Sequence, residues 1–199
     1  MTTGRLEAFS DGVLAIIITI MVLELKAPEG TRITDLGHAT GTGLLTYLLS
    51  FVYVGIYWNN HQHTFQLTQK INGRVLWANL ALLFFLSLLP FATTWMDDSE
   101  FARTPVVFYG VLLLLISLAY FVLQRVIKTA EGDDSALRVA LGGDRKGKIS
   151  VVLYIVGIVA ALVVTAADAG VWIALSLFVV VAILWIIPDS RIDRYYNDQ

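Results

Sequence analysis

The 199-residue sequence contains no cysteine, which excludes disulfide bonds and metal sites built on thiolates. Charge is also scarce, because Asp, Glu, Lys and Arg make up 15% of the residues, against about 25% in an average soluble domain. Hydrophobic residues make up 57% of the chain, and the mean hydropathy is +0.71. The composition therefore predicts an all-α integral membrane protein.

The sequence patterns of common enzyme classes are missing as well. There is no Gly-rich phosphate loop, no HExxH zinc motif and no G-x-S-x-G nucleophile elbow. The TVGYG filter of ordinary potassium channels is also absent. His61 and His63 are separated by one residue, a spacing that points two rings apart on a helix. We therefore expect no enzyme activity, no cofactor, no metal site and no binding to nucleic acid.

Six apolar segments are long enough to cross a bilayer as helices, which requires about 20 residues. Their predicted ranges are 5–25, 41–60, 73–95, 105–127, 149–166 and 170–187. Pro90 is expected to kink the third span near its end, and the short connection 166–170 should make the last two spans an antiparallel hairpin. With no sign of a second soluble domain, residues 1–199 are expected to form one six-helix domain.

Basic residues are distributed unevenly between the two ends of these spans. If both termini lie on one side, that side carries eleven of the 14 Lys and Arg residues, and the other carries only Lys26, Arg32 and Arg103. The positive-inside rule then predicts a multi-pass protein of the cell membrane with both termini and the polar segment 128–148 in the cytoplasm. The opposite side carries seven acidic residues, and a net negative mouth would concentrate cations.

The first span places polar residues before an apolar run, with no charge from Gly12 to Leu23. On a helix, one face of this run carries Ile16, Thr19, Ile20 and Leu23. Such a stripe of branched aliphatic side chains with one hydroxyl could pack against another helix. It could also line a narrow pore.

Polar side chains gather near the cytoplasmic ends of the first three spans. They include Arg5, Ser10 and Asp11 in the first span, His61 at the end of the second and Asn79 in the third. Buried charged and polar groups need partners within a bilayer, so we expect a network that holds the three helices together. The alternative is that Asp11 and His61 handle protons in a proton-coupled or proton-conducting transporter.

Four short motifs resemble those of the transmembrane protein 175 family, in its prokaryotic branch. The R-x-x-x-F-S-D pattern of that family matches Arg5, Phe9, Ser10 and Asp11. Its W-x-x-H, N-L and L-P-F-x-T patterns match residues 58–61, 79–80 and 89–93. One departure is Gln62, where the family often has a second histidine.

The resemblance implies a cation channel, potassium-selective in most members, whose first helix lines the pore of a homotetramer. Carried over residue by residue, the constriction falls on Ile16, with Ile20 and Leu23 as further apolar layers and Thr19 as a hydroxyl ring. Independently, one six-helix unit with a single candidate pore helix cannot enclose a symmetric pore, whereas a closed ring of copies can. The expected partners are therefore further copies of the chain, the lipid bilayer and permeant potassium ions.

The chemistry of the stripe leaves one question open. An aliphatic ring offers no lone pairs to a cation, so it can gate by dewetting but cannot replace the ion's water. Thr19 has the only polar side chain on the stripe. Either the Ile16 layer or the Thr19 layer could dominate selectivity. A secondary transporter is disfavoured, because the sequence shows no internal repeat and no helix broken by Gly or Pro at mid-membrane.

Overall fold

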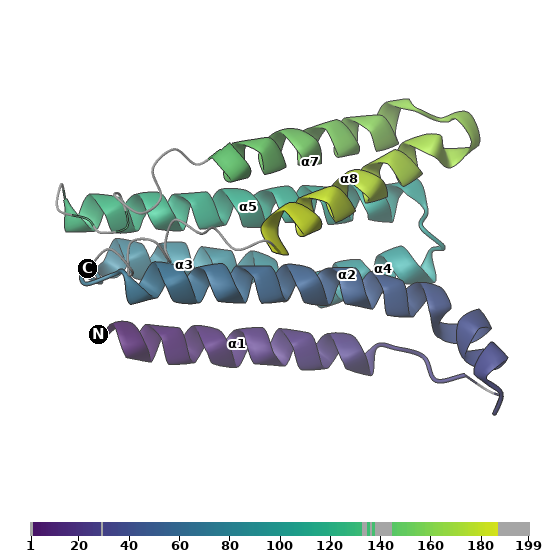
Figure 1. The fold of residues 1–199 in the computed structure, drawn as a ribbon, viewed down its shortest axis with the longest axis horizontal. Coiled ribbons are helices and arrows are strands. Elements are labelled where there is room, and N and C mark those ends of the chain that lie inside the picture. The colour runs from purple at the N-terminus through teal and green to yellow at the C-terminus, as the bar shows by residue number, and fades with distance from the viewer. Residues whose placement is uncertain (1, 29, 133–134, 136, 138–144, 187–199) are drawn as a thin grey trace.

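The computed structural model describes residues 2–28, 30–132, 135, 137 and 145–186, and for residues 33–40 it describes the backbone only. The elements are α1 (Thr3–Leu23), α2 (Ile33–Gln66), α3 (Gly73–Ser87), α4 (Leu89–Asp98), α5 (Arg103–Glu131), α7 (Arg145–Val163), the 3-10 turn η1 (Ala166–Asp168) and α8 (Ala169–Ile186) (Figure 1). Within these ranges, six stretches are long and apolar enough to cross a membrane, with α3 and α4 forming one of them. The predicted all-α, six-span architecture is confirmed.

The second span is longer than predicted. α2 continues to Gln66, whereas the expected span ended at residue 60, so His61 lies within the helix and not behind its end. The segment 61–66 is polar, but His61 and Thr64 hydrogen-bond to side chains of neighbouring helices, which allows the helix to continue. Residue 187, predicted to end the last span, lies outside the described residues.

The third span is divided close to Pro90, as predicted. α3 ends at Ser87, and α4 begins at Leu89 with Pro90 in its first turn. Proline has no N–H to donate, and its ring clashes with the carbonyl four residues earlier, so it kinks or breaks a helix. Leu88 bridges the break, since its N–H donates to Phe85 O at 3.2 Å and its carbonyl accepts from Ala92 N at 3.0 Å.

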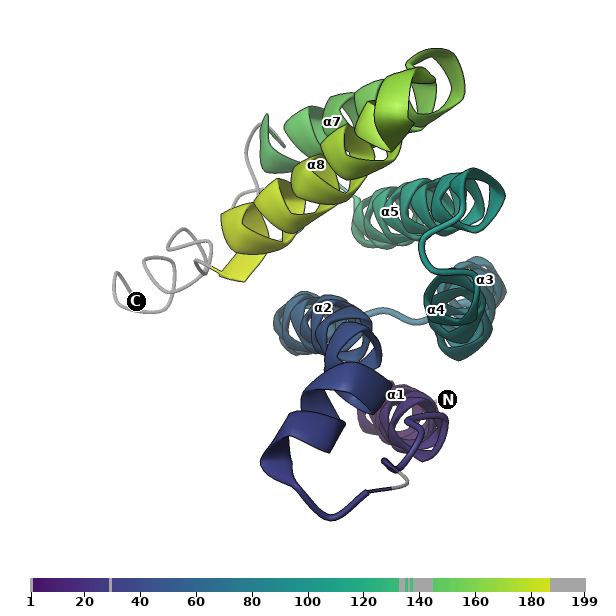
Figure 2. The ribbon, with the colours of Figure 1, turned by 90° about the vertical axis from the view of Figure 1, so that its right-hand side faces the viewer.

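The spans run alternately in opposite directions, so that α1, α3 and α7 begin at the end of the bundle where α5 ends (Figure 1). Viewed along the bundle, α1 packs against α2, α3 and α4 at one side, and α7 and α8 pair at the other (Figure 2). The predicted hairpin of α7 and α8 is tight, because a Cβ at Gly170 would collide with the carbonyl oxygen of Ala160. α1 therefore lies at the side of the bundle.

Buried hydroxyl groups join α2 to α4, α5 and α8. Ser50 Oγ lies 2.7 Å from Thr93 Oγ1 and 3.0 Å from Tyr109 OH. Tyr53 OH donates to the carbonyl of Phe178 at 2.6 Å. Hydrogen bonds of this kind hold helices together in a bilayer, where apolar surfaces alone give little preference for a neighbouring helix over lipid. They make α2 a fixed support for α1.

Candidate functional site

α1 has one buried face and one exposed face. The buried face consists of Leu6, Ser10, Leu14, Ile17 and Met21, which recur every three or four residues. On the other side, Ile16, Ile20 and Leu23 are 58%, 41% and 80% exposed, and Thr19 is exposed as well. We call Ile16, Thr19, Ile20 and Leu23 the α1 stripe. Packing within the protomer uses the opposite face, so the α1 stripe points out of the bundle.

The hydroxyl of Thr19 is held by its own helix. Its oxygen lies 3.0 Å from the carbonyl oxygen of Ala15 and 2.9 Å from that of Ile16, and the hydroxyl donates toward both. Because its proton points to the helix backbone, the lone pairs of the oxygen remain available on the exposed side. The one side-chain oxygen of the α1 stripe is therefore an acceptor, which is the chemistry that binds a cation.

Arg5 and Phe9 lie on the same side of α1 as the stripe, nearer the start of the helix. Phe9 is 49% exposed, and Arg5 is exposed as well. With 3.6 residues per turn, Arg5 lies within about 20° of Ile16 around the helix axis. The side chain of Arg5 has no ion pair or hydrogen bond with any residue that the structure describes, so Arg5 does not join the expected polar network within one protomer.

Three of the predicted network residues meet where α1, α2 and α3 pack together. Asn79 Nδ2 donates to Ser10 Oγ at 3.0 Å, and Asn79 Oδ1 lies 2.8 Å from His61 Nε2. The Ser10 hydroxyl donates in turn to the Leu6 carbonyl at 2.9 Å. Ser10, Asn79 and His61 are at most 1% exposed. They form a buried Ser10–Asn79–His61 chain across the three helices.

The order of donors and acceptors in this chain determines the tautomer of His61. The amide nitrogen of Asn79 donates to Ser10, so its oxygen is the atom that accepts from His61, and His61 Nε2 must carry the proton. The other ring nitrogen, Nδ1, is buried and has no hydrogen-bond partner within the described part of the chain. A second proton on Nδ1 would create a buried charge without a partner, which is unfavourable.

Asp11 bonds to α2 at two positions other than His61. Its Oδ1 accepts hydrogen bonds from Trp58 Nε1 at 3.0 Å and from Gln62 Nε2 at 2.7 Å. Trp58 and Gln62 are four residues apart and share one face of α2, a pairing that becomes predictable once the helix is known to continue beyond residue 60. No hydrogen bond joins Asp11 to His61, so the proton-relay alternative lacks a direct link between its two groups.

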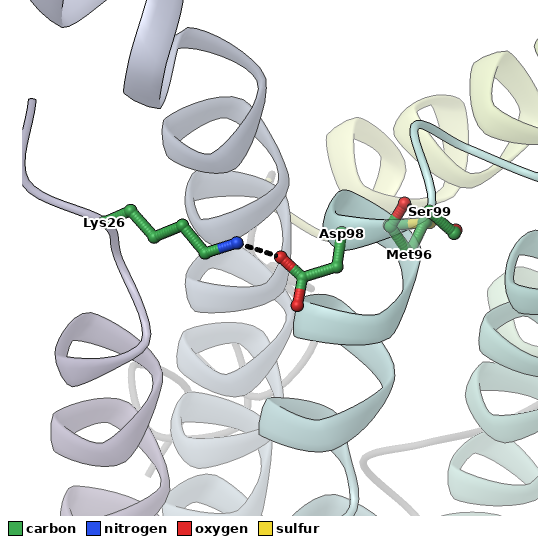
Figure 3. Close-up of polar contacts among 4 residues, drawn as sticks. All are labelled: Lys26, Met96, Asp98 and Ser99. Carbon is green, nitrogen blue, oxygen red and sulfur yellow. Dashed lines mark hydrogen bonds and ion pairs between the residues drawn. The ribbon is translucent and has the colours of Figure 1, made fainter.

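At the opposite end of the bundle, an exposed ion pair joins the segment that follows α1 to α4. Lys26 Nζ lies 2.7 Å from Asp98 Oδ1 at the end of α4 (Figure 3). The hydrogen bond and the negative charge of Asp98 raise the pKa of Lys26 above its usual value. Arg103 lies 3.6 Å from Asp168, beside the turn before α8.

Among the described residues, no three His, Asp or Glu side chains come together as a possible metal site.

Comparison with known proteins identifies related channels. A family model described as the endosomal/lysosomal potassium channel TMEM175 matches residues 5–90. A potassium channel of Chryseobacterium is 50% identical over 194 residues, which cover 98% of this chain and 97% of the relative. The human endosomal/lysosomal proton channel TMEM175 is 34% identical over 117 residues, which cover 53% of this chain and 23% of the human protein.

The fold has a counterpart among solved structures. The crystal structure of a lysosomal potassium-selective channel TMEM175 homolog from Chamaesiphon minutus matches with a TM-score of 0.75 and 26% sequence identity. The match covers 94% of this chain and 97% of that one, so the whole six-span arrangement is shared. Together with the nearly end-to-end similarity to the Chryseobacterium channel, this shows that the chain belongs to the TMEM175 family of ion channels.

Proposed function

We propose that this protein is a potassium channel that conducts passively through a pore lined by α1 from four copies of the chain. The names of its near full-length relatives support potassium as the permeant ion. One relative is called a potassium channel, and the solved homologue is called potassium-selective. The observation that carries the pore assignment is the exposed α1 stripe, an apolar face with one hydroxyl acceptor. Such a channel needs no cofactor, and its ligand is the permeant potassium ion.

More than one copy would be required, because α1 lies at the side of its own bundle (Figure 2), and the number four is what the resemblance to the family implies. A closed ring of protomers would turn four α1 stripes toward a common axis. Each residue of the stripe would then appear four times, as one layer. With a rise of 1.5 Å per residue, the layers from Ile16 to Leu23 would extend over about 10 Å of the pore.

The Ile16 and Thr19 layers would have different roles in conduction. Ile16 would form an apolar constriction that excludes bulk water, and a bare charge at mid-membrane costs from about 2.5 to more than 10 kcal/mol. The Thr19 layer, about 4.5 Å further along the axis, would offer four oxygen acceptors. These oxygens would replace part of the water that a potassium ion gives up at the Ile16 layer.

The Ser10–Asn79–His61 chain and the contacts of Asp11 would set the rotation of α1. They hold one face of α1 against α2 and α3. A slip of one residue would rotate the helix by about 100° and turn the α1 stripe away from the axis. We therefore assign this network a positioning role.

We further propose that both termini face the cytoplasm of the cell. Within the described residues, Arg5, Lys70, Arg74, Arg125 and Lys128 lie toward the end of the bundle where α1 begins. Lys26 and Arg103 lie at the other end, where each is paired with an acid. Arg138, Arg191 and Arg194, which also entered the predicted charge bias, lie outside the described residues.

Single-cysteine labelling tests this orientation cleanly, because the natural chain has no cysteine. Arg145→Cys and Ala27→Cys replace exposed residues at opposite ends of the bundle. A membrane-impermeant maleimide added to intact cells should label position 27 and should reach position 145 only after the cells are opened. The opposite pattern would reverse the orientation.

Recordings from the purified protein in a planar bilayer test the function. With potassium on one side and sodium on the other, we expect discrete single-channel steps and a reversal potential set by potassium. Stepless transport that requires a proton gradient would indicate a transporter instead. A current carried by protons alone, without potassium current, would contradict the assigned ion.

A further inference from the structure

A second feature lies away from the α1 stripe. A cavity of about 380 Å³ is enclosed by α2, α5, α7 and α8, toward the end of the bundle where α7 begins. Its wall is mainly apolar and aromatic, and includes Tyr53, Ile56, Tyr57, Leu118, Tyr154 and Trp185. The volume falls within the range of about 300–1,000 Å³ that is typical of sites for small organic ligands.

The cavity reaches the surface of the protomer at residues of α5 and α7. Leu118 and Phe121 on α5 line it and are 41% and 44% exposed, and Val152 on α7 is 56% exposed. These residues lie within membrane-spanning helices. The molecules that face this opening in a cell are therefore lipids.

Gln124 supplies the most specific sign of a ligand. It lines the cavity and is only 6% exposed, and its side chain forms no hydrogen bond with another residue in the described ranges. Its amide atoms are not among the fully buried side-chain atoms that lack a partner in the described ranges, so they keep accessible surface and can bond to an occupant of the cavity. The side chain thus offers two N–H donors and one acceptor to whatever occupies the cavity.

The position of Gln124 along α5 indicates which part of a lipid it would meet. It lies seven residues before Glu131, the end of α5, which is about 10 Å along the helix. At this depth the polar head groups of a bilayer give way to hydrocarbon. Lys148, in the first turn of α7, also lines the cavity and is exposed, so a positive charge stands at its polar end.

We propose that this cavity binds an anionic phospholipid of the surrounding leaflet. One acyl chain would fill the aromatic part between Tyr53, Tyr57 and Tyr154. An ester oxygen would accept from the Gln124 amide, and the phosphate would pair with Lys148 Nζ. Basic pockets between membrane helices bind anionic head groups in the same way.

Native mass spectrometry of the purified full-length protein tests the proposal, with phosphatidylglycerol and phosphatidylcholine as probes. The wild type should retain phosphatidylglycerol in preference. Lys148→Ala should reduce that preference about fivefold, which corresponds to one basic residue near an anionic lipid. Gln124→Leu should weaken the binding of both lipids, and Val151→Phe should prevent it by filling the cavity. Arg125→Ala, which removes an exposed charge beside Gln124 but outside the cavity lining, should change nothing.

Several results would overturn the proposal. An equal effect of Arg125→Ala and Lys148→Ala would show attraction to a general basic surface. Retention of phosphatidylcholine as strong as that of phosphatidylglycerol would show that Lys148 does not select anionic lipids. Binding of free fatty acid but not phospholipid would identify another ligand. If Val151→Phe does not fold, the lipid binding of Lys148→Ala and Gln124→Leu still tests the proposal. The readout is bound mass, so it does not depend on ion conduction or on orientation.

Discussion

Ile16→Asn should raise the single-channel conductance and bring the permeability to sodium close to that of potassium. In the proposed tetramer, this change replaces an apolar ring by one that can hold water, so the barrier due to dewetting falls. A wider and wetter constriction no longer requires the ion to shed water, and selectivity decreases. Bi-ionic reversal potentials and unitary currents measure the two effects.

Thr19→Val should act in the opposite direction on the potassium current. Valine keeps the shape of the side chain, but it removes four oxygen acceptors from the proposed pore. If these oxygens offset the lost hydration by as little as about 1.4 kcal/mol, the current should fall about tenfold. The reversal potential should shift toward that of a non-selective pore.

Two control positions on the same helix follow from the structure. Met21 is 3% exposed, on the buried face, and Met21→Leu roughly conserves its volume. Val22 is 46% exposed but lies off the stripe, so Val22→Asn matches Ile16→Asn in chemistry. Both controls should keep the wild-type reversal potential. A shift produced by Val22→Asn, with none from Ile16→Asn or Thr19→Val, would place the pore on another face of α1.

The second large effect is expected for Asn79→Leu, which should lower the thermal stability of the assembled protein in detergent. The change leaves the Ser10 oxygen without its donor and the His61 Nε2–H without its acceptor, and both groups are buried. An unsatisfied buried group costs about 1–3 kcal/mol in water-soluble proteins, and hydrogen bonds in membrane proteins average about 0.6 kcal/mol. The expected loss is therefore about 1–3 kcal/mol in total.

Variants of Asp11 provide the comparison. Asp11→Asn keeps an oxygen that can accept from Trp58 and Gln62, so stability should change little. Asp11→Ala removes both bonds and should have an intermediate effect, because Asp11 is only half-buried and water can reach its partners. Melting curves of the three variants should rank Asn79→Leu as the most damaging. Should Asp11→Asn be the least stable, the negative charge of Asp11 would matter more than its hydrogen bonds.

Features that depend on local composition were predictable from the sequence. The six apolar spans, the break close to Pro90 and the tight hairpin around 166–170 each follow from a short stretch of residues. The end of α2 was not predictable in this way. Segment 61–66 is polar, and it stays helical within the bundle because His61 and Thr64 find partners on other helices.

The polar network was also predictable only in part from the sequence. Its members could be named from the sequence, since buried polar groups in a bilayer require partners. The partner of each group depends on how α1, α2 and α3 pack against one another. In the structure, Asp11 bonds to Trp58 and Gln62, and His61 bonds to Asn79. Arg5, expected in the same network, instead lies on the exposed face.

The sequence by itself determined that Ile16, Thr19, Ile20 and Leu23 share one face of a helix, because helical periodicity requires it. It did not determine whether that face is buried in the bundle. The opposite face, with Leu6, Leu14, Ile17 and Met21, is just as apolar, and lipid is as apolar as a protein interior, so hydrophobicity cannot distinguish the two. Only the tertiary structure decided it, since Ser10 bonds to Asn79 on α3 and thereby turns the α1 stripe outward.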